Sequence, residues 1–408
     1  MEDAVIVGAG IAGLATAVAL KRVGIRALVL ERSDTLRTTG AALTLFPNAW
    51  LALDALGVSH KLTSLYSPIS GGSVTKVDTG AVQEISFAAN IEPRSVHRRA
   101  LLEALAQELP PDSVKFSAKI TTIDVQEQNG ASSAVVCLED GTTIKSKVLI
   151  GCDGVHSVVA KWLGLSEPIH SGRSAVRGLA VYPQGHGFKQ EVNQFVDVGK
   201  RAGFVPLNDK ELYWFLSCNE GKDVPKDPEV IQKEIIEKYA VKFPSLYLDV
   251  VRHADLSSLT WAPLMLRNPL DMIFGNVNKR NVTVAGDAMH PMTSDLGQGG
   301  CLALEDAVVL GRHISNSFIK NGRLVPEEMA RALDAYGKER RWRAAWLITG
   351  SYLSGWFQQG GSNWLMKFLR DVVFYGFLFR KLSSAVLYDC GTLPAASGDQ
   401  LHSSNKTD

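Results

Sequence analysis

A glycine-rich segment near the start of the chain has the spacing of a dinucleotide-binding loop. Gly8, Gly10 and Gly13 form a GxGxxG pattern between an apolar run at 4–7, typical of a buried strand, and a stretch with small residues at helical spacing. In such a loop the first glycine permits a tight turn, the second lets the backbone approach a pyrophosphate, and the third brings the helix against the strand. The phosphates then meet the positive end of the helix dipole. A glycine turn without a ligand is the alternative.

An acidic residue supports the nucleotide interpretation. The run 27–30 predicts a second strand that ends at Glu31. This position, about 20 residues beyond the glycines, is where a carboxylate accepts hydrogen bonds from a ribose diol. An acid here disfavours a nucleotide that carries a 2′-phosphate. Strand, helix, strand and acid together form a βαβ unit, which favours a bound dinucleotide over an empty turn.

A second segment, far downstream, offers a carboxylate and another glycine cluster. The apolar run 281–285 predicts a buried strand. It is followed by Gly286, Asp287, Gly297, Gly299 and Gly300. The aspartate can bind a ribityl hydroxyl, and glycines at a helix start let backbone approach a flat ring whose anionic reduced form the helix dipole stabilises. The two segments indicate one FAD held at both ends, because a nicotinamide cofactor has no use for the second; a loop with a simple helix cap is the alternative.

Length and composition fit two or three domains with a large core. The chain has 408 residues, of which 46% are hydrophobic and 21% charged, and its net charge is +1. This balance gives no indication of a nucleic-acid partner or of an anionic membrane surface. The five cysteines are scattered without a CxxC pair and the nine histidines lack ligand spacing. We therefore expect reduced thiols and no metal site.

No transmembrane segment is expected, since no run of about 20 uncharged apolar residues occurs. Only Met1 to Asp3 precede the first predicted strand, which leaves no room for a targeting peptide. We therefore expect a cytoplasmic location. The sequence does not indicate an oligomeric state.

The expected elements predict an α/β fold with a Rossmann-like FAD-binding domain of the GR2 type. They are helices at 47–56, 300–316 and 326–354, a helix capped by Ser95 with an apolar face of Leu101, Leu102, Leu105 and Leu109, a three-stranded meander at 114–147, and a separate buried strand at 148–152. The middle of the chain predicts a mainly antiparallel sheet. Its expected strands are 82–87, 174–182, 192–198, 202–207, 212–217 and 251–259, with a helix from Asp227-Pro228 to about Lys242.

These elements predict a discontinuous domain organisation. The expected division is 1–70, 96–170 and 271–350 for the FAD-binding domain, 71–95 and 171–270 for an interleaved substrate domain, 351–393 for a C-terminal helical segment, and 394–408 for a disordered tail.

The order and spacing of the motifs resemble one known family. From residue 4 to about 350 the chain is similar to the single-component, FAD-dependent aromatic hydroxylases of the p-hydroxybenzoate hydroxylase fold. Within them it most resembles the plant salicylate-hydroxylase-like monooxygenases, with zeaxanthin epoxidase as a more distant relative. Three motifs carry the resemblance: the glycine loop with Glu31, the segment Cys152-Asp153-Gly154-Val155-His156-Ser157, which is similar to the family's DG motif, and the segment from Gly286 through Pro291 to Gly300.

The resemblance implies roles for particular residues. Arg98 matches an arginine that opens a helix and contacts FAD, Asp153 matches an aspartate linked to FAD and NADPH, and Pro291 matches a proline beside the flavin. A solvated helix charge and a turn aspartate are the alternatives for the first two. The expected cofactor-binding residues are Gly8, Gly10, Ile11, Ala12, Gly13, Glu31, Arg32, Arg98, Asp153, Gly286, Asp287, Pro291, Gly297, Gly299 and Gly300.

The implied activity is that of an FAD-dependent monooxygenase. NAD(P)H reduces the flavin, a C4a-hydroperoxide forms with O2, and one oxygen atom passes to a small aromatic or otherwise electron-rich substrate. No nucleophile or triad is evident; His290 and Pro291 are the candidates for a direct role, and His290 suits a hydrogen-bonding scaffold better than acid–base work. A flavin oxidase or reductase on the same fold and a non-catalytic FAD-fold binding protein stay open.

Two further stretches have competing interpretations. The run 338–343 is rich in Lys and Arg, and helical spacing favours a solvated face over an anion site. The stretch 356–379 is rich in aromatic residues. Packing on the core is the favoured interpretation there, with a substrate entrance or a peripheral membrane contact as alternatives.

Overall fold

A mixed eight-stranded sheet forms the first half of the architecture. The computed structural model describes residues 1–36, 41–88, 91–128, 131–219, 224–359 and 385–394. In order across the sheet the strands are β16 (Asn278–Lys279), β17 (Val282–Val284), β10 (Thr143–Gly151), β1 (Glu2–Val7), β2 (Ala27–Leu30) and β7 (Val114–Lys115), with the hairpin of β8 (Ile120–Gln128) and β9 (Ala131–Leu138) joined to β10. The strands from β17 to β7 run parallel, and β1 lies between β10 and β2. This is the sheet that the GxGxxG pattern predicts.

A seven-stranded sheet forms the other half. Its strands, in order, are β15 (Thr260–Leu266), β11 (Ile169–Val181), β14 (Glu211–Cys218), β13 (Lys200–Pro206), β12 (Glu191–Asp197), β4 (Gly71–Lys76) and β5 (Val82–Ser86). All neighbours pair antiparallel except β12 and β4. A separate two-stranded sheet joins β3 (Ala42–Leu45) to β6 (Arg94–His97). The expected α/β fold with a mainly antiparallel second sheet is confirmed, while the division into domains stays a prediction.

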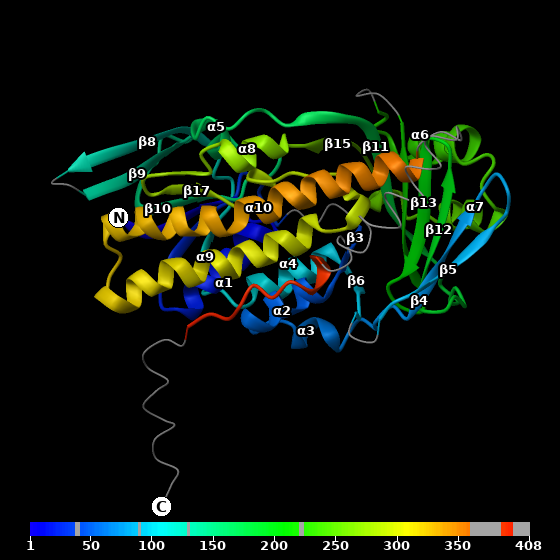
Figure 1. The fold of residues 1–408 in the computed structure, drawn as a ribbon, viewed down its shortest axis with the longest axis horizontal. Helices are drawn as coiled ribbons and strands as arrows, with labels where there is room; N and C mark the ends of the chain where they lie inside the picture. Colours follow the sequence, from blue (N-terminus) through cyan, green and yellow to red (C-terminus); the bar gives the residue numbers. More distant parts are fainter. Residues whose placement is uncertain (37–40, 89–90, 129–130, 220–223, 360–384, 395–408) are drawn as a thin grey trace, which may run out of the picture.

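The helices cover these sheets. They are α1 (Ile11–Arg22), α2 (Pro47–Ala55), α3 (His60–Thr63), α4 (Arg98–Ala106), α5 (Val158–Trp162), α6 (Pro228–Glu234), α7 (Ser245–Arg252), α8 (Pro269–Phe274), α9 (Gly299–Asn321) and α10 (Pro326–Gln359), with the short turns η1 (Ile235–Tyr239), η2 (Leu256–Ser258), η3 (Gly286–Ala288), η4 (Ser294–Leu296) and η6 (Ala385–Leu387). Helices α1, α9 and α10 lie side by side (Figure 1). The first two approach closely because small residues face each other: a Cβ added at Gly311 would lie 2.8 Å from the Cβ of Ala19.

Helix α10 connects the two halves. It has 34 residues and contacts β9 and β16 of the first sheet and β12 and β13 of the second. In Figure 1 it runs along the molecule from the first sheet toward the seven-stranded sheet at the right. Because α10 packs on both sheets, it helps to fix where one sheet lies relative to the other. The geometry of a site between the sheets therefore depends on this helix.

Three expected elements are wrong in detail. Ser95 lies within β6, where its hydroxyl bonds that of Thr44 at 2.8 Å, and α4 begins at Arg98 with His97 as its N-cap residue. The strand expected at 148–152 is the second half of β10, which pairs first with β9 and then with β1. One strand thus serves the hairpin and the parallel sheet together.

The third error is the strand expected at 251–259, which the structure shows as the end of α7 followed by η2. Val250 and Val251 are fully buried because α7 packs its apolar face on the seven-stranded sheet, so helical spacing determines the structure there. The start of α6 is confirmed: the Asp227 carboxylate accepts from the backbone N–H groups of Glu229 and Val230. This helix ends at Glu234 and continues as the π-helical turn η1 rather than reaching Lys242.

Candidate active site

The glycine loop leaves space at one of its three glycines. A Cβ added at Gly8, which has a φ of 99°, would lie 2.6 Å from the Cys152 carbonyl oxygen. A Cβ at Gly13 would lie 1.9 Å from the Gly8 oxygen. At Gly10 an added Cβ would meet no atom of the described residues within 4 Å. Packing therefore requires Gly8 and Gly13, whereas Gly10 borders open space at the N-terminus of α1, where a pyrophosphate fits.

The acid after β2 lies directly beside this loop. Glu31 is buried, and its Oε2 accepts a 2.8 Å hydrogen bond from the backbone N–H of Ala9. Its Oε1 accepts from the N–H of Ser33 at 2.9 Å. Each carboxylate oxygen can accept a further bond, so Glu31 is fixed in place and can still receive ribose hydroxyls. Arg32, the next residue, is exposed.

The second glycine segment contacts the first. Gly286 has a φ of 60°, and a Cβ added there would lie 2.7 Å from the Cβ of Ala12 in α1. Asp287 is exposed, and its Oδ1 lies 3.9 Å from a Cβ built at Gly299. The carboxylate and the start of α9 thus border the same space. A Cβ at Gly300 would lie 3.7 Å from Ile11 Cδ1, so the turn before α9 also reaches the glycine loop.

The residues around this turn are closely packed. Gly297 has a left-handed φ of 64°, and a Cβ there would lie 3.2 Å from the ring of Phe46. Pro291 is buried and accepts a hydrogen bond from the N–H of Arg267 at 3.0 Å. The Gln298 amide is 1% exposed, and its Nε2 has no hydrogen-bond partner among the described residues. A buried amide N–H next to a glycine turn fits a site that holds a polar ring edge.

The DG segment lies against the glycine loop as well. Its Cys152 carbonyl and the Asp153 Cα both lie close to the position of a Cβ at Gly8. Asp153 accepts from the Ser157 hydroxyl at 2.5 Å and from the Val158 N–H at 2.7 Å, and burial raises the pKa of this carboxyl. Asp153 therefore fixes the start of α5. Its contact with FAD or NADPH stays a prediction.

Arg98 lies at the start of α4, as expected. Its N–H reaches the carbonyl of Ala41 at 3.4 Å, and the pairing of β6 with β3 places it beside the segment after residue 40. Whether its guanidinium contacts FAD stays a prediction.

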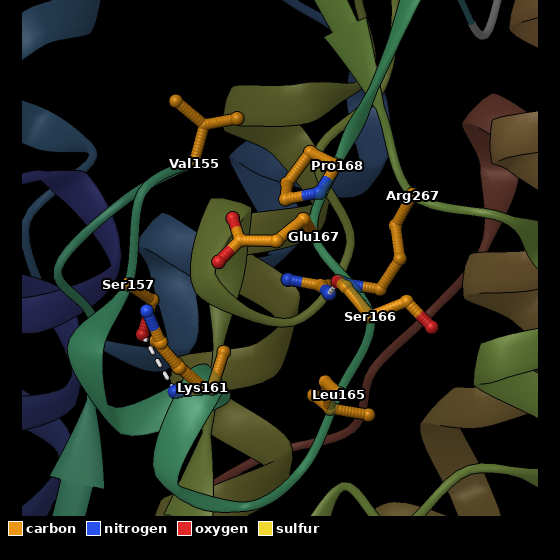
Figure 2. A pocket seen from close by; sticks show the side chains of 9 residues that line it. Val155, Ser157, Lys161, Leu165, Ser166, Glu167, Pro168 and Arg267 are labelled. Carbon is orange, nitrogen blue, oxygen red and sulfur yellow. Dashed lines mark hydrogen bonds between the residues drawn. The ribbon is translucent and has the colours of Figure 1, made fainter.

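Figure 2 shows a small hollow beside the DG segment. It is lined by Val155, Ser157, Ala160, Lys161, Leu165, Ser166, Glu167, Pro168 and Arg267. Arg267 is 1% exposed and donates to the carbonyls of Ser166, Ala288 and Met289. Its guanidinium therefore joins the segment after α5, at Ser166, to the turn that carries Asp287. The sequence pattern did not predict this connection.

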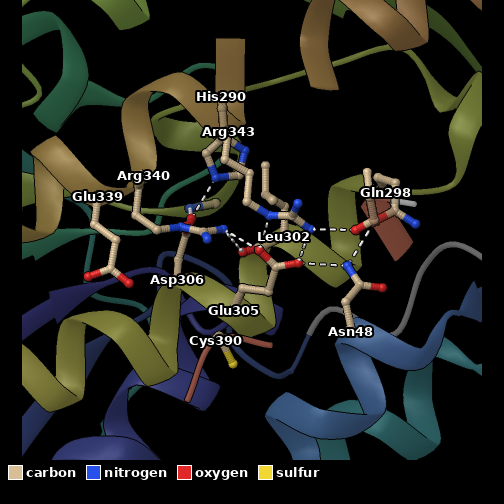
Figure 3. A network of polar contacts seen from close by, with 12 residues as sticks. Asn48, His290, Gln298, Leu302, Glu305, Asp306, Glu339, Arg340, Arg343 and Cys390 are labelled. Atoms are coloured by element: carbon tan, nitrogen blue, oxygen red, sulfur yellow. Dashed lines mark hydrogen bonds and ion pairs between the residues drawn. The ribbon is translucent and has the colours of Figure 1, made fainter. Parts of the chain in front are cut away.

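A buried ion cluster lies beside two residues of the second glycine segment, His290 and Gln298 (Figure 3). Glu305 accepts from Arg340 at 2.6 Å and from Arg343 at 2.5 Å, and Asp306 accepts from Arg340 at 2.7 Å. The Asn48 amide also donates to Glu305, at 2.6 Å. The carboxylates are fully buried and Arg340 is 1% exposed, so the solvated face expected at 338–343 is wrong for its central residue.

Asp306 joins this cluster to the Gly286 turn. Its Oδ2 accepts from the Gly286 N–H at 2.8 Å and lies 2.5 Å from His290 Nε2. Burial opposes ionisation, but His290 and Arg340 outweigh it and lower the pKa of Asp306 to about 2. His290 is itself fully buried, which supports a scaffold role over acid–base work.

The cluster was not predicted as part of the site. Its only signal in the sequence is the pair Glu305-Asp306 within the otherwise apolar run 301–310, together with Arg340 and Arg343 three residues apart in a later helix. Which faces of the two helices meet cannot be read from that spacing. Of the aromatic stretch 356–379, Trp356 and Phe357 belong to the last turn of α10, where Trp356 is exposed and Phe357 is buried. Residues 360–379 of it lie outside the described residues.

The described parts of the chain contain no group of His, Cys, Asp and Glu side chains that could hold a metal ion. Among the same residues, no helix is both long and apolar enough to cross a membrane. All five cysteines are free thiols.

The fold and the joined motifs define a dinucleotide-binding flavoprotein. The chain matches the model of the FAD binding domain family over residues 1–351, and it belongs to that family. Monooxygenase 2 of Arabidopsis thaliana is 42% identical over 404 residues, which cover 96% of this chain and 98% of the relative. The chain is an FAD-dependent monooxygenase, and its cofactor is FAD.

More distant relatives agree with this assignment. The FAD-dependent urate hydroxylase of Mycolicibacterium vanbaalenii is 28% identical over 353 residues, covering 84% of this chain and 85% of the relative. The fold matches a crystal structure of a Klebsiella pneumoniae HpxO variant complexed with FAD at a TM-score of 0.80 and 24% identity. That match covers 95% of this chain and 99% of the other.

Two glycine substitutions separate binding from folding. Gly10→Val places a side chain in open space on extended backbone, with φ −81° and ψ −171°, so it should leave folding intact and weaken FAD binding at least about tenfold by blocking the pyrophosphate. Gly13→Val should instead prevent folding, because its Cβ meets the Gly8 carbonyl. Circular dichroism and FAD titration measure the two effects; Gly10→Val protein that binds FAD normally contradicts the assignment.

Asp306→Asn tests the ion cluster. At pH 7 the FAD-free variant should lose about 3–5 kcal/mol in the free energy of unfolding, since Arg340 is left partly unpaired in a buried site. The folded-state pKa of Asp306, about 2, lies below its usual 3.8, so its ionisation stabilises the fold above pH about 4, and this part is lost as the pH falls toward 2.

The difference between wild type and variant should therefore shrink by about 1 kcal/mol between pH 7 and pH 3, because folded Asp306 is still mostly ionised at pH 3. Urea unfolding at pH 7, 4 and 3 measures it, with Asp334→Asn on the exposed side of α10 as the control. A constant difference at all three pH values argues against the cluster.

Proposed function

We propose that this monooxygenase takes electrons from NAD(P)H and inserts one oxygen atom of O2 into a small, electron-rich aromatic or heteroaromatic substrate. One observation carries the proposal: residues from three distant segments, the Gly8 loop, the Asp153 segment and the Gly286 to Gly300 segment, lie against one another. Bound FAD supplies the electron transfer and the activation of O2. A relative that hydroxylates urate supports a nitrogen-containing ring as substrate.

The chain's own residues would then hold the cofactor at both ends. Gly10 makes room for the pyrophosphate, Glu31 accepts from the ribose, and Asp287 accepts from the ribityl chain. The N-terminus of α9 would lie at the ring, where its partial positive charge favours the reduced, anionic form. Pro291 and the buried His290 shape the ring side of the site.

The substrate would lie against the face of the seven-stranded sheet that is turned toward the ring. Arg201 identifies this face, because its Nη1 donates to the carbonyl of Asp295, two residues before Gly297, at 3.1 Å. Its guanidinium also lies 5.9 Å from the centre of the Phe215 ring. Tyr213 lies two residues before Phe215 on the same strand and therefore on the same face. Burial raises the pKa of its hydroxyl, and Arg177 partly offsets this rise. These aromatic and cationic groups suit a flat, polar substrate.

A cytosolic location fits the five free thiols, which persist in a reducing compartment.

The activity has a direct test. Protein saturated with FAD should be bleached by NADPH or NADH under nitrogen and recover its colour with O2. In 18O2, mass spectrometry of a metabolite extract treated with the protein should show a product heavier by one labelled oxygen atom. Bleaching with H2O2 as the only oxygen product would identify an oxidase or reductase instead.

Asp287→Ala tests the ribityl contact. The side chain is exposed, so folding should be unaffected, while FAD affinity should fall at least about tenfold with the loss of a charge-assisted hydrogen bond. Fluorescence titration with FAD measures the affinity, and Asp334→Ala, an exposed aspartate on α10, is the control. Full flavin occupancy in the variant rules this role out.

A further inference from the structure

A buried ion pair joins the seven-stranded sheet to the turn before α9. The guanidinium of Arg173 on β11 donates two parallel hydrogen bonds to Asp295 in η4, both 2.8 Å long. The side chains are 6% and 3% exposed. This bidentate geometry fixes both the distance and the angle between the two groups.

Local backbone structure directs Arg173 to this position. The pairing of β11 with β15 shifts register between His170 and Ser174, which places Arg173 in a β-bulge, and Gly172 before it has a φ of 81°. A bulge changes the direction of a side chain and is frequent beside active sites. The strand is therefore distorted at the residue that reaches the turn.

Helix α10 is shaped to accept the same guanidinium. A Cβ added at Gly355 would lie 2.0 Å from Arg173 Nη1, so only glycine permits the helix to pass there. Glycine costs about 1 kcal/mol relative to alanine inside a helix, and close approach to Arg173 accounts for its presence. One turn earlier in α10, Ser351 accepts a 3.1 Å hydrogen bond from the hydroxyl of Thr293, two residues before Asp295.

The pair contributes orientation more than stability. Taking two charges out of water costs roughly what their attraction returns, so buried pairs are weak contributors to net stability. The two hydrogen bonds between Arg173 and Asp295 instead fix the distance between the turn 293–300 and the seven-stranded sheet. That turn leads into the N-terminus of α9, which carries the partial positive charge.

We propose that Arg173 is a positioning residue: with Asp295 and Gly355 it holds the N-terminus of α9 against the flavin ring and thereby raises the reduction potential of bound FAD. The inference rests on the proposed placement of the ring at this turn. The adenosine end of the site lies at the Gly8 loop, away from Arg173. The pair therefore acts on the electronic properties of the ring and little on FAD affinity.

Redox titration of FAD-saturated protein with dithionite tests this. Arg173→Met should leave the FAD dissociation constant within about threefold and lower the preference for the reduced form about tenfold, which is about 30 mV for a two-electron couple. Arg173→Lys, which keeps the charge but loses the second hydrogen bond, should lie between Arg173→Met and the wild type. The absorption bands of the bound flavin should shift in the same order.

Gly355→Ala provides an independent variant. Alanine improves helix propensity, yet its Cβ displaces Arg173, so the variant should lower the potential as Arg173→Met does. Arg312→Met, which removes a 2.6 Å ion pair between α9 and α10 away from the turn, is the matched control and should leave the potential unchanged.

The outcomes distinguish the possibilities. A lower melting temperature with an unchanged potential in Arg173→Met, Arg173→Lys and Gly355→Ala means a purely structural pair and overturns the inference. Loss of FAD affinity in step with the potential overturns it as well. The titration uses neither NAD(P)H nor substrate, so a failure of the proposed reaction, or wild-type protein that binds no FAD, is detected separately.

Discussion

The pairing of two buried carboxylates with two guanidinium groups between α9 and α10 is the constraint on which the site depends. Burial favours the neutral form of Arg340, yet Glu305 and Asp306 raise its pKa well above its usual value, so this guanidinium stays charged inside the fold. A buried carboxylate without its partner would be costly, and the two helices therefore have one favourable arrangement. Asp306 also accepts a hydrogen bond from the Gly286 N–H, and this bond orients the segment that carries Asp287.

Local patterns in the sequence were sufficient for the motifs and for most elements. The glycine loop, Glu31 and the strand before Asp287 could be predicted because each depends on neighbours within about 25 residues and on a known backbone geometry. The start of α6 was equally local, since Asp227 caps its own helix. The contacts among the three motifs followed from topology: parallel strands bring their carboxyl ends to one edge of a sheet.

Features that depend on distant partners could not be read in the same way. Arg340 lies in a charged run that is indistinguishable from a solvated helix face until α9 is packed against it. Val251, the first residue of the expected strand, suits a strand by propensity, but packing on the seven-stranded sheet selects a helix, as tertiary contacts often do. The β-bulge at Arg173 has no signal except Gly172, because a register shift is a property of two strands together.

The order of the cofactor-binding segments along the chain affects how the protein folds during synthesis. The glycine loop is translated first, whereas β17 and Asp287 follow only after the whole seven-stranded sheet. On the ribosome α1 therefore waits for α9, the helix that packs on it, until the strands of both large sheets have been synthesised. Flavin can stabilise the fold, by mass action on its native state, only once Asp287 and the start of α9 have been made. Bound flavin therefore acts on the assembled fold and not on the first folding steps of the glycine loop.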